Sequence, residues 1–400
     1  MKGTKYIWSF LIVFVCCCAA YGQQLRIGIF RDYAAKKVIF DYDKGSYSIY
    51  NDTGFVAAIL PNESAQLSVT PDNLVELKYN YQTVGKFSKI RLVENQLNNN
   101  ISVQVTEPKS KTRKYQNDFE IFADKGSLTI VNLVDISNYL AGVVESEGGG
   151  GKELEYYKVQ ALISRTYLYK YFNKHAEEGF SLCDRVHCQA YHSMMRFTPS
   201  IEQAVKETGN LVMKDDHGHL IDAYFHANCG GQTSEAQYVW NNNVPYLNSF
   251  RDTFCIYTKQ AVWEKRIPQQ EWADFLVKKY NYPINDTVFG PLIFTFNQPD
   301  RMAFYQSAVL GIPLRDIRIN FGLRSTFFNV SPDGTDVLLT GRGYGHGVGL
   351  CQEGAMKMAY YQYNFRQIAI YYFPGAQIVS LEDEDFFRYT SDFKEQLENF

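Results

Sequence analysis

After its first two dozen positions, the sequence lacks any apolar run long enough to cross a membrane, and it lacks an excess of positive charge. No later stretch reaches the roughly 20 apolar residues that a transmembrane helix requires. The 400 residues include 40 Lys and Arg against 43 Asp and Glu, which gives a net charge of −3. Without a basic surplus there is no reason to expect a nucleic-acid partner. We therefore expect a neutral or weakly charged substrate and a mature chain without a transmembrane segment.

The sequence also lacks internal repeats and nucleotide-binding motifs. The segment GRGYGHGVG at residues 341–349 superficially invites a dinucleotide interpretation. However, none of its glycines begins a G-x-G-x-x-G pattern, and no Lys followed by Ser or Thr completes a P-loop. The spacing therefore excludes both kinds of nucleotide site.

The first residues indicate export. Two lysines precede an apolar run that ends at Ala20, and the small residues of AYG at 20–22 suit a signal peptidase. We predict a signal peptide at residues 1–22 and a secreted, periplasmic or cell-envelope location. The alternative is lipid attachment at one of the three cysteines at 16–18. It is disfavoured because Phe14 or Val13 stands where a lipoprotein would carry Leu.

Two patterns divide the mature chain. Residues 23–133 contain short alternating runs at 25–30, 37–42, 46–50 and 119–122, separated by Asn, Asp, Gly and Pro, which predicts antiparallel strands. Residues 96–114 look like a long exposed loop. Residues 134–380 mix predicted helices at 153–174, 201–208, 269–280 and 352–363 with strands near 211–213, 220–226 and 336–340. We predict an α+β fold with an N-terminal antiparallel β region, a mixed α/β catalytic domain and a C-terminal extension at 381–400.

Four consecutive glycines at 148–151 separate two acids, Glu145 and Glu147, from the predicted amphipathic helix at 153–174. Glycines let a ligand approach the backbone closely, whereas the alternative is a flexible linker with surface acids. Arg165 falls on the apolar stripe of this helix, and burying a lone charge costs several kcal/mol. Arg165 therefore predicts a nearby carboxylate and favours a functional site.

A second constellation contains His175, Cys183, His187 and Cys188 within fourteen residues. Tetrahedral zinc accepts such a Cys₂His₂ set and can replace a missing local core. His192 is an alternative ligand to His175. The rival interpretation is a Cys183–Cys188 disulfide, which suits an exported protein but leaves His187 unexplained. We predict structural zinc.

Two further histidines lie beside glycine-rich turns. His346 is flanked by glycines and has no side-chain cover, which favours a position facing a cavity, although a lone His is usually structural. The predicted strand at 220–226 brings His226 to the turn CGGQT at 229–233, where Cys229 could form a disulfide with Cys255. Cys351 would then remain unpaired, either buried as a small apolar group or exposed beside the site.

Taken together, these segments resemble the stage II sporulation protein D and amidase enhancer family from about residue 115 to 376. The shared motifs are YLAGVV at 139–144 with Glu147 after it, KVQA at 158–161, SRTY at 164–167, CQAY at 188–191, CGGQT at 229–233, Trp240, PYL at 245–247 and GRGYGHGVGLCQEGA at 341–355. Several motifs in the family's order make chance similarity improbable. The chain departs from the family where EGG replaces Glu-Met-Pro and where Cys351 replaces Ser.

The resemblance implies an exported peptidoglycan lytic transglycosylase that cleaves glycan strands stripped of stem peptides. It also implies zinc at the segment that contains Cys183, His187 and Cys188. Its catalytic glutamate corresponds to Glu147, which must be protonated near neutral pH and therefore needs an apolar setting. A salt bridge to Arg165 would oppose this, so we expect Arg165 to pair elsewhere, for example with Glu145, or to hold a substrate oxygen. His346 is the expected catalytic partner. The expected substrate contacts are Gln160, Arg165, Tyr191, His226 and Gln352.

Two other functions remain open. Some relatives are described as enhancers of a separate amidase, and such a protein would grip glycan without cutting it. A zinc hydrolase with the metal at the reaction centre is a weaker alternative, because four protein ligands leave no open position for water. The expected partners are therefore peptidoglycan glycan strands and, for the enhancer, a cell-wall amidase.

Overall fold

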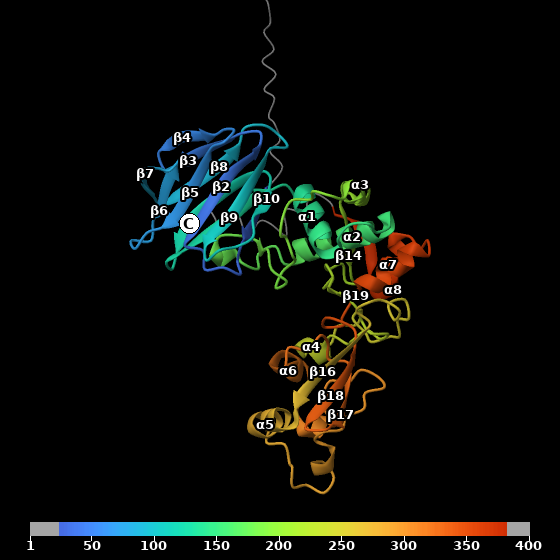
Figure 1. Cartoon of the computed structure of the whole chain (residues 1–400). Coiled ribbons are helices and arrows are strands. Elements are labelled where there is room, and N and C mark those ends of the chain that lie inside the picture. The colour runs from blue at the N-terminus through green and yellow to red at the C-terminus, as the bar shows by residue number, and fades with distance from the viewer. Residues whose placement is uncertain (1–23, 382–400) are drawn as a thin grey trace, which may run out of the picture.

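The computed structural model describes residues 24–381 and has the predicted α+β fold (Figure 1). The predicted signal peptide, the three cysteines at 16–18 and all but the first residue of the C-terminal extension lie outside the described residues. Between residues 24 and 381, no helix combines the length and the apolar character needed to cross a membrane.

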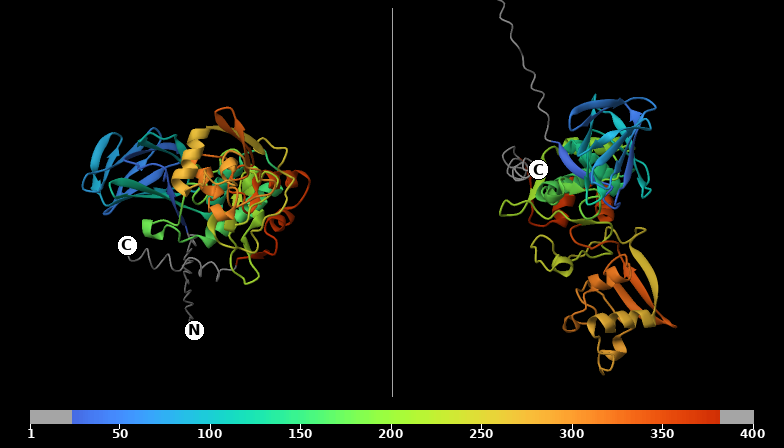
Figure 2. Two further views of the ribbon diagram at one scale, coloured as in Figure 1. Left: turned by 90° about the horizontal axis from the view of Figure 1, so that it is seen from below. Right: turned by 90° about the vertical axis from the view of Figure 1, so that its left-hand side faces the viewer.

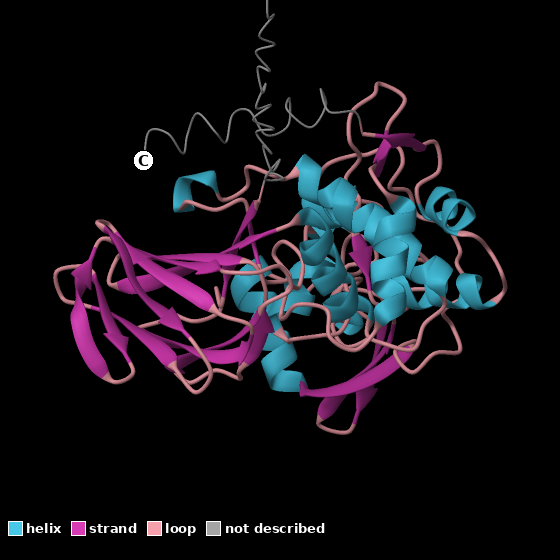
Figure 3. Cartoon of the chain, turned by 90° about the horizontal axis from the view of Figure 1, so that it is seen from above, coloured by secondary structure: helices cyan, strands magenta, loops and turns pink. Residues whose placement is uncertain are grey.

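The N-terminal region consists of two sheets that share one hydrophobic core (Figures 1 and 3). One sheet has the order β13-β1-β12-β11-β8-β3-β4 and the other has the order β10-β9-β2-β5-β6-β7. All pairings are antiparallel except that between β1 and β13. The strands are β1 Leu25–Ile29, β2 Lys37–Lys44, β3 Tyr47–Asn51, β4 Gly54–Ile59, β5 Ser64–Val69, β6 Val75–Tyr79, β7 Gln82–Phe87, β8 Lys89–Glu94, β9 Asn100–Glu107, β10 Arg113–Tyr115, β11 Asp118–Asp124, β12 Ser127–Val134 and β13 Leu182–Cys183.

The predicted strands of this region are confirmed as β1, β2, β3 and β11. The predicted loop at 96–114 is wrong, because it contains β9 and β10. Ile101, Val103 and Val105 alternate into the core along β9, while the residues between them face outward and are largely polar. This half-polar strand lies among Asn and Lys residues, so its composition resembled that of a loop.

The helical region is built around α2 Leu154–Lys170. It contacts α1 Ile136–Gly148, α3 Pro199–Thr208, α7 Gln352–Tyr360, α8 Phe365–Tyr372 and β14 Leu211–Lys214. Strand β14 pairs with β20 Gln377–Ser380, and β15 Phe225–His226 pairs in parallel with β19 Leu350–Cys351. The prediction of an amphipathic helix is corrected, because α2 is buried almost continuously from Tyr156 to Tyr169. The surrounding elements cover every face of this helix.

A third part, residues 262–342, packs around a hydrophobic cluster of its own (Figure 2). Its sheet has the order β16-β18-β17 and is formed by β16 Val262–Pro268, β17 Phe328–Asp333 and β18 Asp336–Arg342. The helices are α5 Gln269–Tyr280 and α6 Leu314–Asn320, together with the short helices η2 Gly290–Leu292 and η3 Ala308–Leu310. The sequence interpretation did not separate this module, although the helix at 269–280 and the strand at 336–340 are confirmed.

The connection between β15 and the third part is largely irregular. It contains one short helix, α4 Gln237–Trp240. Before this connection, the expected strand at 220–226 is reduced to its last two residues, which form β15. Another short helix, η1 Ala176–Glu178, follows α2. Long irregular segments of this kind need side-chain anchors, because few backbone hydrogen bonds hold them.

Candidate active site

Glu147 lies in the last turn of α1, so the acids do not belong to a flexible linker. The helix ends at Gly148, and the glycine-rich turn begins at Gly149 with a φ of 64°. A side chain at Gly148 would place its Cβ 2.8 Å from the ring of Tyr156. Helix α2 can therefore approach the end of α1 closely and shield Glu147 with an aromatic ring. The sequence interpretation did not identify α1.

The surroundings of Glu147 favour its neutral form. Burial raises the pKa of this carboxyl, and one hydrogen bond, donated to Oε1 by the Ala190 N–H at 2.7 Å, partly offsets the effect. The negative end of the α1 dipole also disfavours a carboxylate here. Among residues 24–381, no Lys or Arg forms an ion pair with Glu147. A partly shielded carboxyl of this kind can act as a proton donor.

Arg165 does not have the expected carboxylate partner. Its guanidinium donates to the carbonyl oxygens of Leu211 at 3.2 Å and Val205 at 3.3 Å, and to the hydroxyl of Thr208 at 3.2 Å. The residue is only 2% exposed and faces α3 and β14. Neutral oxygens therefore satisfy this buried cation, and the predicted pairing with Glu145 is wrong.

Two other expected substrate contacts also belong to the interior. Gln160 is fully buried, and its Oε1 accepts hydrogen bonds from Tyr156 and Gln352, both at 3.4 Å. Tyr191 is fully buried, its hydroxyl donates to Asn132 at 3.0 Å, and its ring fills the space above Gly142. Direct substrate contact by Gln160, Arg165 or Tyr191 is therefore corrected to a supporting role.

The two histidines of interest lie side by side, with ring centroids 5.5 Å apart. His346 donates from Nε2 to the Phe225 carbonyl at 3.0 Å and accepts the Val348 N–H at Nδ1 at 3.1 Å. Burial lowers the pKa of His346 to about 4, so its ring is neutral at physiological pH. His226 uses Nδ1 to contact the Val348 carbonyl, and its buried Nε2 has no hydrogen-bond partner among the described residues.

Aromatic side chains collect around His346. The ring of Trp240 lies 5.2 Å from His346 and 4.4 Å from Tyr224 between centroids. Trp240 is 43% exposed and Tyr344 is 46% exposed. Flat, accessible rings suit sugar faces. Tyr224 and Tyr344 were not predicted as site residues. Only the fold brings Tyr224 to Trp240, and the only signal for the two tyrosines was their presence in the same motifs as His226 and His346.

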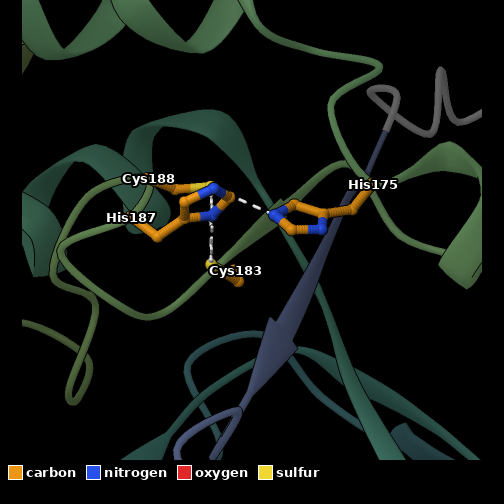
Figure 4. Close-up of side chains that lie close together, drawn as sticks. All are labelled: His175, Cys183, His187 and Cys188. Carbon is orange, nitrogen blue, oxygen red and sulfur yellow. Dashed lines mark hydrogen bonds between the residues drawn. The ribbon is translucent and has the colours of Figure 1, made fainter.

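The predicted metal-binding side chains converge (Figure 4). The four donor atoms of His175, Cys183, His187 and Cys188 lie within 4.8 Å of one another. The two sulfur atoms are 3.4 Å apart, beyond the roughly 2.05 Å of a disulfide, and both thiols are free. Nε2 of His175 lies 3.4 Å from the sulfur of Cys188. His192 is not part of this cluster, so its alternative role as a ligand is not supported.

This donor set fits zinc chemically. Two sulfur and two nitrogen donors match a closed tetrahedral zinc site. Glu178 contacts Nδ1 of His175 at 2.5 Å, which orients the ring and leaves Nε2 directed toward Cys188. A carboxylate behind a ligating histidine is typical of zinc sites.

The loop that carries this cluster also shapes the surroundings of Glu147. Asp184, next to Cys183, accepts N–H bonds from Phe30 at 2.6 Å and Arg31 at 3.1 Å, and forms an ion pair with Arg113 at 2.6 Å. Two residues after Cys188, the Ala190 N–H contacts Glu147. Residues 183–197, called the strap loop below, therefore connect the metal-binding cluster, the β region and the end of α1.

The predicted Cys229–Cys255 disulfide is not formed. Both thiols are free, and their sulfur atoms lie 3.3 Å apart, which is too far for a covalent bond. Cys351, which was expected to be unpaired, is also free and buried, and its sulfur accepts the Cys229 N–H.

Comparisons with known proteins match the region that carries Glu147 and the strap loop. Residues 124–214 match the family model SpoIID, stage II sporulation protein. An uncharacterized protein of Brachyspira hyodysenteriae (strain ATCC 49526 / WA1) is 29% identical over 258 residues, which cover 63% of this chain and 69% of that protein. Stage II sporulation protein D of Bacillus subtilis (strain 168) is 27% identical over 269 residues, or 62% and 75% of the two chains. An amidase enhancer of the same strain is 25% identical over 293 residues, or 60% of this chain and 40% of that protein.

Proposed function

We propose that this chain, whose residues 124–214 match the SpoIID family model, acts as a member of the stage II sporulation protein D and amidase enhancer family and is a peptidoglycan lytic transglycosylase. Its substrate is the glycan strand of the bacterial cell wall, preferably after the stem peptides have been removed. The predicted signal peptide at residues 1–22 directs it to the periplasm, the cell envelope or the medium, where this substrate is found.

The setting of Glu147 is the observation that carries this proposal. Its carboxyl is partly shielded, lies at the negative end of a helix and receives one backbone hydrogen bond. These conditions raise the pKa of Glu147, and a general acid requires a shift in this direction. By contrast, Glu145 accepts the N–H groups of Arg196 at 2.8 Å and Phe197 at 3.0 Å, so its oxygens are occupied by the strap loop.

One carboxyl is sufficient for the reaction. Glu147 donates its proton to the glycosidic oxygen on the anomeric carbon of N-acetylmuramic acid, and the leaving sugar departs with a hydroxyl group. The carboxylate then accepts the proton of the muramic acid 6-hydroxyl while that oxygen bonds to the anomeric carbon. The product carries a 1,6-anhydro ring, and Glu147 is protonated again. No water is consumed, so the second carboxyl of two-acid glycoside hydrolases is not needed.

The aromatic group around His346 would supply glycan binding. Trp240 and Tyr344 offer exposed aromatic faces for sugar rings. His346, the proposed catalytic partner, is neutral and fixed by two backbone groups, so it can orient a substrate hydroxyl group but is a poor proton acceptor. His226 and Gln352 were also expected to contact substrate, but they are only 4% and 7% exposed, so in this proposal they too support the site from the interior.

The cluster of His175, Cys183, His187 and Cys188 would hold a structural zinc ion. Zinc there would cross-link the start of the strap loop and supply a fixed point that its irregular backbone lacks. The reaction is carried by Glu147 and does not pass through this group.

A second candidate function, that of an amidase enhancer, is favoured by the relative of that name. In this case the chain would bind glycan and a cell-wall amidase without cutting the strand. A shielded carboxyl with a raised pKa has no use in such a protein, and this is why the enzyme is preferred.

Mass spectrometry of reaction products tests the proposal. Wild type, Glu147→Gln and Glu153→Gln are each incubated with intact and with amidase-stripped peptidoglycan. Glu153 is exposed at the start of α2, so its variant removes the same charge outside the site. We expect anhydro-muramyl ends from wild type and Glu153→Gln but not from Glu147→Gln. Glycan binding without any soluble product from wild type would instead support the enhancer.

A further inference from the structure

A second group of metal-binding side chains lies outside the site described above. Cys229, Asp252, Cys255 and Cys351 place one donor atom each within 4.8 Å of the others, and all four residues are completely buried. They come from the turn after β15, from the irregular segment before β16 and from the N-cap of α7. The fold therefore gathers three thiols and a carboxylate, whereas a disulfide would use only two of these groups.

The distances within this group suit a shared cation. The sulfur of Cys229 lies 3.3 Å from the sulfur of Cys255 and 3.3 Å from Oδ2 of Asp252. The sulfur of Cys351 accepts the Cys229 N–H at 3.3 Å. Two thiolates on one tetrahedral zinc ion lie roughly 3.8 Å apart, and the sulfur atoms of a disulfide lie about 2.05 Å apart. The observed separation is closer to that of a metal site.

The carboxylate in this group lacks a counter-charge. Asp252 accepts the Tyr372 hydroxyl at 2.8 Å and the Phe254 N–H at 2.9 Å. Among residues 24–381, no Lys or Arg forms an ion pair with it. An isolated buried carboxylate is strongly unfavourable, and a bound divalent cation would supply the missing positive charge.

The surrounding charge also suits a thiolate site. Three thiolates and one carboxylate around a divalent ion leave a net charge of −2. Arg301, which is 6% exposed, donates to the carbonyl of Cys229 at 2.7 Å and lies beside the cluster. A fixed cation at this distance lowers the cost of burying that negative charge.

The backbone around these four residues has little regular structure, so a cross-link would stabilise it. Residues 227–261 contain α4 as their only helix in the described structure and otherwise consist of turns and isolated bridges. Close packing brings the pieces together, because a Cβ at Gly354 would lie 2.7 Å from Oδ2 of Asp252. A metal ion can provide the rigidity that regular secondary structure would otherwise provide.

We propose that Cys229, Asp252, Cys255 and Cys351 bind one zinc ion in a second, closed and structural site. Thiolate ligands select zinc among the common divalent ions, and four protein ligands leave no position for a reactive water. Cys351 belongs to β19, which pairs with β15, where His226 lies, and Gln352 follows it directly. The site therefore holds the segments that carry His226 and Gln352 in register.

Metal analysis of the full chain tests this site without reference to activity. Protein purified without thiol reductant is dialysed against metal-free buffer, and zinc is measured by plasma mass spectrometry. We expect two zinc ions per wild-type chain, one in Cys255→Ser and one in Cys183→Ser, whose change lies in the other cluster. A single zinc that is lost in Cys183→Ser and kept in Cys255→Ser would overturn the proposal.

A second measurement does not depend on the folding of any variant. Wild type is denatured with a chelator and no reductant, alkylated with iodoacetamide, digested and analysed by mass spectrometry. We expect Cys229, Cys255 and Cys351 each to carry one alkyl group, and all three to resist alkylation in the native, metal-loaded protein. A peptide pair cross-linked between Cys229 and Cys255 would overturn the zinc site and restore the disulfide. Asp252→Asn, which keeps the shape, should release zinc at a lower chelator concentration than wild type.

Discussion

The last turn of α1 and the strap loop at residues 183–197 meet at Glu147, yet they obtain their shapes in different ways. The helix is fixed by its own backbone hydrogen bonds, and Gly148 lets Tyr156 pack against it. The strap loop includes only Cys183, the last residue of β13, as regular structure, and it depends on side chains at both ends. Glu147 is thus positioned by regular structure, whereas much of its surroundings is positioned by side-chain contacts and hydrogen bonds.

Because the two regions obtain their shapes in different ways, substitutions in them should have different effects. Changing the acid should remove the chemistry and leave the fold intact. Changing the anchors of the strap loop should remove the Ala190 contact and admit water around Glu147, so that stability and chemistry fall together. The following predictions test this separation.

A change in the metal-binding cluster at 175–188 should have the largest effect. In Cys188→Ser we expect the loss of one zinc ion and a lower melting temperature. The strap loop should become sensitive to limited proteolysis, and turnover should decrease by about 10²- to 10⁴-fold as Glu147 loses its shielded setting. His192→Ala is the matched control, because His192 is exposed, lies in the same loop and is outside the cluster. If Cys188→Ser kept full turnover and an unchanged melting temperature, the strap loop would not need this anchor.

Glu147→Gln should separate chemistry from stability. We expect turnover to fall by about 10²- to 10⁴-fold, the usual contribution of a general acid, with zinc content unchanged. Burial raises the pKa of Glu147, so the folded state keeps a proton that the unfolded state has lost as the pH rises above the ordinary value. Wild-type stability therefore decreases as the pH rises through that interval.

The same shift gives a pH test of this variant. Glu147→Gln cannot ionise, so its melting temperature should exceed that of wild type at pH 8 and match it at pH 4. Wild-type turnover should decrease as the pH rises through the pKa of Glu147, because the acid form is lost. Equal melting temperatures at both pH values would show that Glu147 is not in a shielded setting.

The same comparison explains what the sequence could predict. Features that depend on neighbours in the chain could be predicted, such as the cluster of four possible metal ligands at 175–188 and the helices at 201–208 and 269–280. Strand β9 was missed because its polar, outward residues resemble those of a loop. The spacing of residues in the sequence cannot show which faces of a strand or helix are covered by elements from distant parts of the chain.

Arg165 illustrates that limit within the site. Its position on an apolar helix face correctly implied that the guanidinium is buried and satisfied. The sequence could not show that carbonyl groups from α3 and β14, rather than a carboxylate, would satisfy it. The contact between Ala190 and Glu147 was hidden for a similar reason, because any residue can offer a backbone N–H.

Asp184→Asn should have a moderate effect on the other side of the strap loop. The carboxylate of Asp184 pairs with Arg113 and accepts two backbone N–H bonds, and an amide keeps only part of this network. Hydrogen bonds to charged groups contribute about 1.5–3 kcal/mol each, so we expect a loss of roughly 3 kcal/mol in the free energy of unfolding, measured with urea. Zinc content should not change. A loss of zinc equal to that in Cys188→Ser would mean that the β region and the cluster form one unit.

Glu145→Gln should have the smallest effect of the series. The amide oxygen of Gln can still accept one of the two N–H bonds from Arg196 and Phe197. Both of these hydrogen bonds lie near the surface. We expect a loss of about 1 kcal/mol in the free energy of unfolding and a decrease in turnover of less than about 10-fold. Glu153→Gln, at an exposed position, gives the baseline for removing one charge. A decrease as large as that in Glu147→Gln would make Glu145 part of the chemistry, and the two acids of α1 would then have to be treated as a catalytic pair.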